Sequence, residues 1–484
     1  MSANRPAAVV VLAAGEGTRM KSATPKVLHP ICGRSLVGHV VAAARALDPE
    51  HLVVVVGHAR EQVAAHLAEA DPGVRTAVQA EQNGTGHAVR MGLEELSASG
   101  VALDGTVVVV CGDTPLLTGE TLTALAGTHA ADGNAVTVLT AEVPDATGYG
   151  RIVRGADGAV TAIVEHKDAT EAERAIHEIN SGVFAFDAQL LTDALGKVRT
   201  DNSQGEEYLT DVLGILREAG HRVGASVAAD HREIVGINNR VQLAEARKLL
   251  NERLLHQAML AGVTVVDPAT TWVDVTVTFG ADALVHPGTQ LLGATHVGAG
   301  AEVGPNSRLT DTTVDEGATV SFTVADSAVV GEGASVGPYA YLRPGTRLGR
   351  KAKAGTYVEM KNAEIGEGTK VPHLSYVGDA TIGEYTNIGA ASVFVNYDGE
   401  AKHHTTVGSH CKTGSDNMFV APVTIGDGAY TAAGSVITKD VPPGSLAVAR
   451  GQQRNIEGWV ARKRPGSAAA QAAQAARQDD DGAK

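Results

Sequence analysis

The second half of the chain carries an aliphatic or aromatic residue at every sixth position. The series runs through Phe279, Val285, Leu291, Val297, Val303 and Leu309, and it resumes at Val330, Val336, Leu342 and Leu348. A period of six fits neither the 3.6-residue turn of a helix nor simple strand alternation, so each hexapeptide is expected to form one short strand and a turn. Three such hexapeptides close a triangular coil, and residues eighteen apart then stack about 4.8 Å apart. The pattern predicts a parallel β-helix built of hexapeptide repeats.

The repeat slips at four places, where the chain is expected to leave the coil. The slips lie between Leu309 and Val330, between Ala354 and Ile365, near Val377, and between Phe394 and Val407. A β-sandwich with chance spacing is the alternative architecture, but a sandwich has no reason to hold a fixed six-residue phase.

The first half lacks this period and alternates apolar runs with helical stretches. Runs at 7–14, 51–58 and 106–113 are separated by predicted helices near 36–47 and 61–70. Such continuous runs are typical of parallel strands that helices cover on both faces, and ligands gather where these strands end. We therefore expect an α/β domain over 1–231, a linker helix over 232–262, the β-helix over 263–464 and a disordered tail over 465–484.

Composition excludes several classes of protein. Acidic residues (55) outnumber basic ones (40), which argues against nonspecific binding to nucleic acid or to an anionic membrane. Three cysteines without a CxxC pair fit a reducing compartment, with neither a disulfide framework nor a zinc site. The early apolar run is too short for a spanning helix and lacks the flanks of a signal peptide, so a cytoplasmic protein is expected.

A glycine-rich turn follows the first predicted strand. Its sequence is LAAGEGTRM, from Leu12 to Met20, and Lys26 lies shortly after it. Backbone N–H groups in such a bend can face phosphate, with Arg19 and Lys26 as countercharges. A dinucleotide-binding turn is a weaker alternative, because Met20 replaces the third glycine. Asp113, at the end of a later strand, is either a ligand for Mg²⁺ or a turn-forming aspartate.

These motifs together resemble a known family. The turn, Pro25-Lys26, QAEQNGTGH (79–87), Gly112-Asp113, GYGRI (148–152), Glu165-His166-Lys167, Asn180-Ser181-Gly182 and GINNR (236–240) are similar to those of sugar-nucleotide pyrophosphorylases. With the β-helix behind them, residues up to about 464 resemble the bacterial bifunctional enzymes that acetylate glucosamine-1-phosphate and then uridylate N-acetylglucosamine-1-phosphate, which feeds peptidoglycan precursor synthesis. The resemblance implies a Rossmann-like nucleotidyltransferase domain followed by a left-handed β-helix.

For the first half, the resemblance implies transfer of uridylate from UTP with release of pyrophosphate and with Mg²⁺ as cofactor. It places the nucleotide on Leu12, Ala13, Ala14, Gly15, Arg19, Lys26, Gln79, Gln82, Gly84 and Thr85, the metal on Asp113 and Asn238, and N-acetylglucosamine-1-phosphate on Gly150, Glu165, Asn180 and Tyr208. Judged alone, Glu165 would be a solvated strand residue and Tyr208 an aromatic at the core edge.

In the second half, Arg343 and Lys361 are eighteen residues apart and are expected to stack on one face as a phosphate clamp. His373 follows Glu359 by about one coil, and a histidine beside a carboxylate can act as a base, although a lone histidine is more often structural.

The resemblance makes His373 the base of acetyl transfer, with Glu359 in support. It places glucosamine-1-phosphate on Arg343, Lys361, Tyr376, Asn387 and Lys402, and acetyl-CoA on Asn396, Tyr397, Ser415, Ala433 and Arg450. Members of this family are trimers, so a homotrimer is expected. Trp459 is a candidate for stacking on the adenine of CoA, or else a packed anchor.

Two other functions remain as alternatives. One is a nucleotidylyltransferase with a single activity and a merely structural β-helix, which would leave Arg343, Lys361 and His373 without a reason. The other is a scaffold or regulatory subunit without chemistry, which need not keep Arg19, Lys26 and Asp113 together.

Overall fold

The computed structural model describes residues 5–202 and 204–482 and divides the chain into two compact units, one ending at Gly317 and the other beginning at Ala318. The division falls inside the β-helix, away from the expected boundaries at 231 and 263. The reason is that the first coils pack on the linker helix. Asn251 of that helix donates to the carbonyl oxygen of Thr271 at 2.8 Å and accepts from the amide of Val273 at 2.9 Å.

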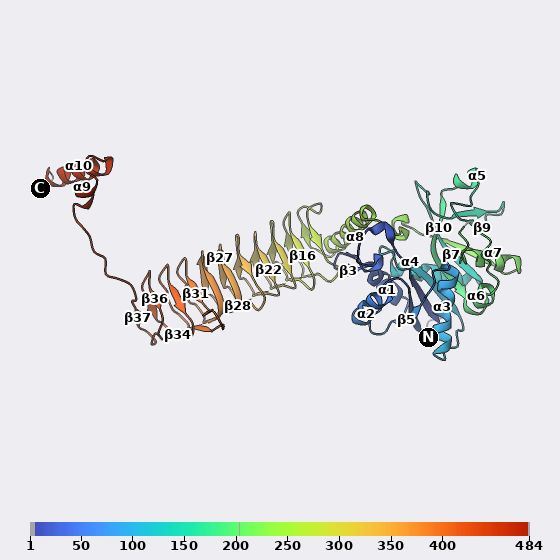
Figure 1. Ribbon diagram of the computed structural model, residues 1–484, viewed down its shortest axis with the longest axis horizontal. Coiled ribbons are helices and arrows are strands. Elements are labelled where there is room, and N and C mark those ends of the chain that lie inside the picture. The colour runs from blue at the N-terminus through green and yellow to red at the C-terminus, as the bar shows by residue number, and fades with distance from the viewer. Residues whose placement is uncertain (1–4, 203, 483–484) are drawn as a thin grey trace. The chain divides into compact units, whose positions relative to one another are not determined.

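The first unit begins with a mostly parallel sheet in the order β11-β7-β10-β6-β1-β4-β5, in which only β10 runs antiparallel to its neighbours β6 and β7 (Figure 1). The strands are β1 Ala8–Ala13, β4 His51–Val56, β5 Arg75–Val78, β6 Thr106–Cys111, β7 Val136–Glu142, β10 Glu178–Asp187 and β11 Val223–Val227, with β8 Arg151–Arg154 and β9 Val160–Val164 joined beside β10. The predicted α/β architecture is confirmed.

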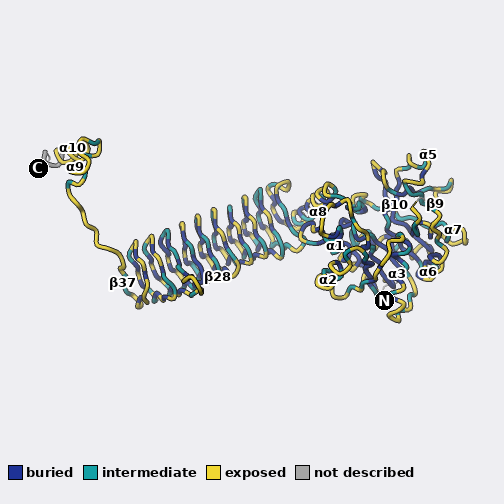
Figure 2. The backbone as a smooth tube through the Cα atoms, in the orientation of Figure 1, coloured by how far each residue is buried: buried dark blue, intermediate teal, exposed yellow. Residues whose placement is uncertain are grey.

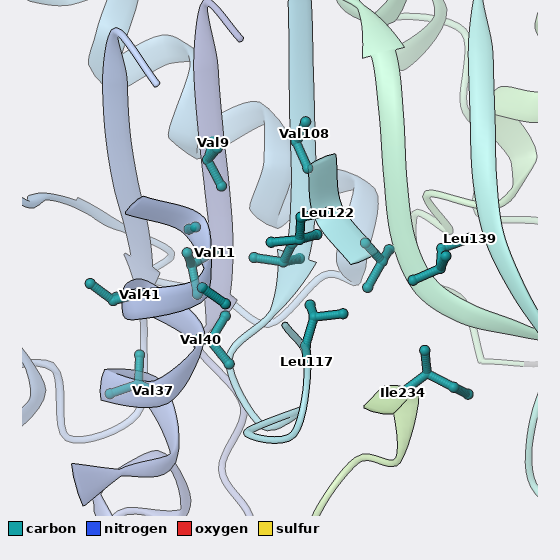
Figure 3. Packing of buried hydrophobic residues seen from close by; sticks show 14 of the residues in the cluster. Val9, Val11, Val37, Val40, Val41, Val108, Leu117, Leu122, Leu139 and Ile234 are labelled. Carbon is teal, nitrogen blue, oxygen red and sulfur yellow. The ribbon is translucent and has the colours of Figure 1, made fainter. Parts of the chain in front are cut away.

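Helices cover both faces of this sheet. One face carries α1 Leu36–Arg45, α2 Arg60–Ala70 and α4 Gly119–Asp132, and the other carries α3 Thr85–Ala98, α6 Ala188–Leu195 and α7 Asp211–Glu218. Figure 3 shows α1 packed on the sheet through Val37, Val40 and Val41, near Val9 and Val11 of β1. Because side chains alternate along a strand, odd-numbered residues of β1 face α1 and even-numbered ones face α3, which explains the unbroken apolar runs.

Short elements and the linker helix complete this part of the unit. The short elements are η1 Thr18–Met20, η2 Lys26–Leu28, β2 Pro30–Ile31, β3 Arg34–Ser35, α5 Glu171–Arg174 and η3 His231–Ile234. The linker helix, α8, spans Arg240–Leu260, shorter than the predicted 232–262. It begins where the side chain of Asn239 accepts hydrogen bonds from the amides of Val241 and Gln242.

The first coils of the β-helix belong to this unit. Their strands are β12 Thr264–Val265, β13 Trp272–Val273, β14 Thr278–Phe279, β15 Leu284–Val285, β16 Gln290–Leu292, β17 His296–Val297, β18 Glu302–Val303, β19 Arg308–Thr310 and β20 Thr313–Val314. From Val285 to Leu309 the aliphatic residue of each hexapeptide is fully buried, as predicted, whereas Phe279 is only partly buried. A small residue two positions before each buried aliphatic residue is buried as well, such as Ala283, Thr289 or Thr295. Each strand therefore points two side chains inward, one small and one large.

The second unit continues the same repeat. Its strands are β21 Thr319–Val320, β22 Val324–Asp326, β23 Val329–Val330, β24 Ser335–Val336, β25 Tyr341–Leu342, β26 Arg347–Leu348, β27 Lys353–Thr356, β28 Glu359–Ile365, β29 Lys370–His373, β30 Tyr376–Ile382, β31 Val393–Val395, β32 Thr405–Val407, β33 Met418–Val420, β34 Val423–Ile425, β35 Tyr430–Thr431, β36 Val436–Ile437 and β37 Leu446–Ala447. The named strands of successive coils pair in parallel, and buried and exposed stretches alternate along the coils (Figure 2). The predicted left-handed parallel β-helix is confirmed.

Only one of the four slips in the repeat is a large excursion. After Phe394 the chain forms a loop with an antiparallel bridge between Tyr397 and Lys402, and partners on either side of it are 25 residues apart, as for Ala380 and Thr405. At the other slips the coil shortens instead, to 17 residues for Glu359 and Tyr376 and to 16 for Thr319 and Ser335. The expectation of excursions there is wrong, because a tighter corner absorbs the missing residue.

The tail was expected to be disordered. The structure has the helix α10 Ala468–Gly482 within this tail, and the short helix α9 Trp459–Lys463 lies just before the tail. Alanine, the commonest residue of the tail, is the best helix former, so intrinsic propensity explains α10 without a buried face.

Candidate active sites

A pocket lies at the carboxyl ends of β1 and β6, where the glycine turn, the start of α3 and the loop after β6 meet. It is lined by Leu12, Ala13, Ala14, Gly15, Lys26, Val27, Gln79, Gln82, Gly84, Thr85, Ala88, Cys111, Asp113 and Glu206. All predicted nucleotide residues except Arg19 are among them, together with the predicted metal ligand Asp113. Sequence motifs did not mark Glu206, although it lies two residues before the predicted sugar-binding residue Tyr208.

Two glutamine side chains hold the walls of this pocket. The amide of Gln82 donates to the carbonyl oxygen of Ala14 at 3.0 Å, and that of Gln79 donates to the carbonyl oxygen of Gly84 at 3.0 Å. Gly84 has φ of 105°, and a Cβ there would lie 2.5 Å from the carbonyl oxygen of Glu207. Only glycine fits this close approach, so the start of α3 is held against residues 206–209.

Asp113 and Asn238 meet around one ammonium group. Lys26 Nζ donates to Asp113 Oδ2 and, at 3.1 Å, to Asn238 Oδ1, which also accepts from Arg19 at 2.9 Å. Arg19 therefore joins this group although it does not line the pocket itself. The fold brings all four predicted charged and metal-ligating residues of this half together.

The oxygen pair is chemically suited to Mg²⁺. Asp113 Oδ2 and Asn238 Oδ1 both accept from Lys26 Nζ, so the two oxygens are close enough together to bind one small hard cation. In nucleotide sites Mg²⁺ takes one or two protein oxygens, and phosphate and water complete its coordination shell. Over the described ranges no group of three or more His, Cys, Asp or Glu side chains could hold a metal. The residues present thus fit a metal that arrives with a phosphate ligand.

Three of the predicted sugar-binding residues also converge. A Cβ on Gly150 would lie 3.3 Å from Glu165 Oε1 and 3.5 Å from Asn180 Cβ, and the amide of Asn180 donates to the carbonyl oxygen of Gly150 at 2.9 Å. Burial, then the nearby carboxylates of Asp168 and Asp211, raises the pKa of Glu165. Tyr208 is buried, and its hydroxyl accepts a hydrogen bond from Gln204 at 2.8 Å; among the described residues no hydrogen bond joins it to Gly150, Glu165 or Asn180.

Tyr149 lies between the two groups. Its burial and the carboxylate of Asp113 raise the pKa of its phenol, while a hydrogen bond to the backbone of Gly236 lowers it. The residue before Gly150 therefore reaches the loop that carries Asn238.

In the second unit, the predicted stack of cations is in register. Leu342 pairs with Met360, and the amide of Arg343 donates to the carbonyl oxygen of Met360 at 2.8 Å, which sets Arg343 beside Lys361 on the next coil. A neighbouring Lys402 side chain, then partial desolvation, lowers the pKa of Lys361. Three cationic side chains thus gather at this face, and the loop after Phe394 supplies one of them.

Polar side chains extend the same face. Asp379 accepts from Asn362 at 2.8 Å and from Asn396 at 2.5 Å, and the Asn396 amide also lies 3.4 Å from the hydroxyl of Tyr376. These hydrogen bonds, and then Lys361 and Lys402, outweigh burial and lower the pKa of Asp379. Asp379 was not among the predicted residues, although its carboxylate fixes Asn396.

His373 occupies another strand than the cations. His373 lies in β29 and pairs with Thr356 of β27. It is exposed, and so is Leu374 after it, with an exposed fraction of 62%. Glu359, predicted to support it, directs its carboxylate to Arg343 at 2.9 Å. The cause is the corner between β29 and β30, which sets Tyr376, and not His373, beside Glu359. Asn387 is also exposed and bridges to Lys370 and Lys412.

Three of the predicted acetyl-CoA residues stack on later coils. The amide of Gly434 donates to the carbonyl oxygen of Ser415 at 2.9 Å, and Arg450 donates to the carbonyl oxygen of Ala433 at 3.1 Å. Tyr397 lies on the loop, with its hydroxyl on the carbonyl oxygen of Gly399 at 2.5 Å. Trp459 begins α9 with an exposed fraction of 45%.

No helix in the described part of the chain is long and apolar enough to cross a membrane. Comparison with known proteins supports a two-part transferase. The MobA-like NTP transferase domain family matches residues 9–179, and the bacterial transferase hexapeptide family, with six repeats, matches residues 404–439.

Curated relatives cover the whole chain. It is 84% identical over 483 residues to the "Bifunctional protein GlmU" of Streptomyces avermitilis, with 100% of each chain covered. The identity to proteins of the same name is 65% over 477 residues for Thermobifida fusca, with 99% of each covered, and 60% over 473 residues for Corynebacterium glutamicum, with 97% of each covered. The chain belongs to the family of bifunctional GlmU proteins.

Proposed function

We propose that this bifunctional transferase makes UDP-N-acetylglucosamine in two steps. Acetyl transfer from acetyl-CoA to glucosamine-1-phosphate takes place in residues 263–464, and uridylyl transfer from UTP to N-acetylglucosamine-1-phosphate takes place in residues 1–231. The observation that carries this proposal is the convergence of Lys26, Asp113 and Asn238 at the pocket beside the glycine turn. The product is a peptidoglycan precursor.

In the uridylyl site, a phosphate oxygen of the sugar attacks the α-phosphorus of UTP, the new P–O bond forms, and the bond to pyrophosphate breaks. Arg19 and Lys26 stabilise the charge that grows on the leaving group, and the amides of Gln79 and Gln82 contact the uracil edge. Asp113 and Asn238 would hold Mg²⁺ together with the triphosphate, and the ion would supply neutralisation of phosphate charge.

The sugar lies over Gly150, where the missing side chain leaves room beside Glu165 and Asn180. Sugar hydroxyl groups donate to the Glu165 carboxylate and satisfy a group whose ionisation burial disfavours. We assign Tyr208 to the sugar as well, on the family resemblance alone.

In the acetyl site, His373 takes a proton from the amine of glucosamine-1-phosphate as the nitrogen attacks the thioester carbon. The C–N bond forms, the C–S bond breaks, and the proton passes to the CoA thiolate. Arg343, Lys361 and Lys402 bind the phosphate, Tyr376 and Asn387 bind the sugar, and Glu359 acts through Arg343. Asn396, Tyr397, Ser415, Ala433 and Arg450 contact acetyl-CoA, and Ser415 or Asn396 donates to the oxyanion.

A homotrimer completes the acetyl site, because each face of a coil is shallow. An exposed ridge runs beside His373 along one corner of the coils, formed by Tyr339, Tyr357 and Leu374 with exposed fractions of 55%, 58% and 62%. The rings of Tyr339 and Tyr357 stack 5.3 Å apart. A neighbouring chain that covers this ridge would bring its own side chains to the substrate. We assign the enzyme to the cytoplasm, because three cysteines without a CxxC pair fit a reducing compartment.

The test is a product assay on the full chain. Purified protein is incubated with glucosamine-1-phosphate, acetyl-CoA, UTP and Mg²⁺, and each component is omitted in turn. UDP-N-acetylglucosamine should form only in the complete mixture, and N-acetylglucosamine-1-phosphate should replace both glucosamine-1-phosphate and acetyl-CoA. A complete mixture that yields no UDP-N-acetylglucosamine would refute the proposal.

Two substitutions separate the two sites. His373→Ala should lower acetyl transfer by on the order of 10² to 10⁴, as for loss of a general base, and leave uridylyl transfer unchanged. Asp113→Ala should lower uridylyl transfer by on the order of 10² or more and leave acetyl transfer unchanged. Loss of both activities in either folded variant would contradict a two-site enzyme.

A further inference from the structure

Arg151 is a buried cation that forms no ion pair with any described residue; a hydrogen bond from Thr147 and, more weakly, the charge of Arg151 lower the pKa of the exposed Asp145 carboxyl nearby. The exposed fraction of Arg151 is 2%, and none of the ion pairs among the described residues includes it. Its three contacts are the carbonyl oxygen of Tyr149, Nδ1 of His166 at 3.4 Å and the carbonyl oxygen of Arg174 at 3.5 Å. Its Nε is buried and has no hydrogen-bond partner. A buried charge is costly, so a role beyond packing is needed to explain it.

The strand geometry places this side chain behind the proposed sugar pocket. Arg151 pairs with Val164 in β9 and with Ile179 in β10, so Gly150 lies beside Glu165 and Asn180. Successive residues of a strand face opposite sides, and Arg151 therefore lies on the face away from Gly150. Ile179, its partner, belongs to the apolar cluster on that face.

Each contact of Arg151 fixes a segment that carries a pocket residue. Tyr149 directly precedes Gly150, His166 directly follows Glu165, and Arg174 ends the short helix α5 that continues from the Glu165 loop. Because a guanidinium only donates hydrogen bonds, His166 Nδ1 is the acceptor of this contact. One side chain thus ties together the loops on both sides of the pocket.

We propose that Arg151 is the positioning residue of the N-acetylglucosamine-1-phosphate site, holding Gly150 and Glu165 at their binding distance from behind the sheet. This inference rests on the proposed uridylyl transfer. The planar guanidinium of Arg151 is needed, because three acceptors lie around it. A lysine ammonium or an apolar side chain cannot reach all three.

The test compares Arg151→Met and Arg151→Lys with the matched variant Arg154→Met in the full chain. Arg154 lies on the same strand but pairs with Glu178 at 2.6 Å near the surface. KM for N-acetylglucosamine-1-phosphate and KM for UTP are measured separately, with thermal unfolding of each variant.

For Arg151→Met we expect KM for the sugar phosphate to rise between about tenfold and a hundredfold, with KM for UTP changed less than about twofold. Arg151→Lys should give a smaller rise, and Arg154→Met none. Equal increases in both KM values, or the same effect from Arg154→Met, would show a general structural role and overturn the inference. If Arg151→Met does not fold, the same comparison is made with Arg151→Lys, for which only KM for the sugar phosphate should rise. Wild-type enzyme that does not use this sugar phosphate would refute the proposed function instead.

Discussion

At the scale of single residues, Glu165 couples pH to stability. Burial and two neighbouring carboxylates raise its pKa, so the folded chain binds this proton more tightly than the unfolded chain does. Its contribution to stability is therefore present at acid pH and is lost as the pH rises from the ordinary glutamate range, about 4.3, through its folded value. At neutral pH the residue destabilises the empty enzyme, and its retention fits a binding role.

Glu165→Gln should accordingly raise the unfolding temperature at pH 7.5, with a gain that shrinks toward pH 4. The same variant should raise KM for N-acetylglucosamine-1-phosphate, because an amide oxygen is a weaker acceptor than a carboxylate. Glu245→Gln, exposed on α8, is the control and should change neither quantity. A gain that persists undiminished at pH 4 would exclude the ionisation of Glu165 as its cause.

Residue-level prediction from sequence worked where a motif fixes the backbone. Lys26, Asp113 and Asn238 lie far apart in the chain, yet each follows a turn that the family pattern marks, and they meet as predicted. Glu359 was predicted to support His373, but its carboxylate accepts from Arg343 instead. The corner after His373 causes this, and sequence spacing alone does not fix the conformation of that corner. Arg151 lies within the GYGRI motif, but the motif does not reveal that its side chain lies on the face away from Gly150, and Asp379 lies outside every motif.

At the scale of elements, the coil depends on glycine where backbones meet. A Cβ on Gly355, beside β29, would lie 2.0 Å from the carbonyl oxygen of Pro372, the residue before His373. Gly214 in α7 contrasts with it, since nothing lies within 4 Å of its Cβ position.

Gly355→Ala should therefore destabilise the β-helix, by about 1 to 3 kcal/mol as for overpacking, and lower acetyl transfer more than uridylyl transfer. Gly214→Ala should have the opposite sign, stabilising the first unit by roughly 0.5 to 1 kcal/mol. Activity that remains after graded heating reports on each site separately. Equal effects of the two variants would mean that the contact with Pro372 does not limit the coil.

The elements themselves were largely readable from the sequence. The predicted helices at 36–47 and 61–70 correspond to α1 and α2, and the period of six located the coils. The second inward position was missed because it is filled by alanine, serine or threonine, which a search for aliphatic residues passes over. The coils of 16 and 17 residues were read as excursions, since sequence spacing alone cannot separate a tight corner from a loop.

At the scale of the whole molecule, acetyl transfer should depend on association and uridylyl transfer should not. Sedimentation at micromolar concentration should give three times the 49.6 kDa chain mass. On dilution into dissociation, specific acetyl transfer should fall while specific uridylyl transfer stays constant. An acetyl site that remains fully active in a proven monomer would contradict the shared site.

The coil register has a consequence for how such chains can change length. Deleting six residues between Arg343 and Lys361 would turn every later side chain onto the next side of the prism and separate these two residues. Deleting one complete coil would keep all sides aligned and only shorten the rod by about 4.8 Å. Insertions and deletions among natural variants should therefore come as entire coils, or as extra residues at corners such as 396–404, where the main chain already departs from the prism.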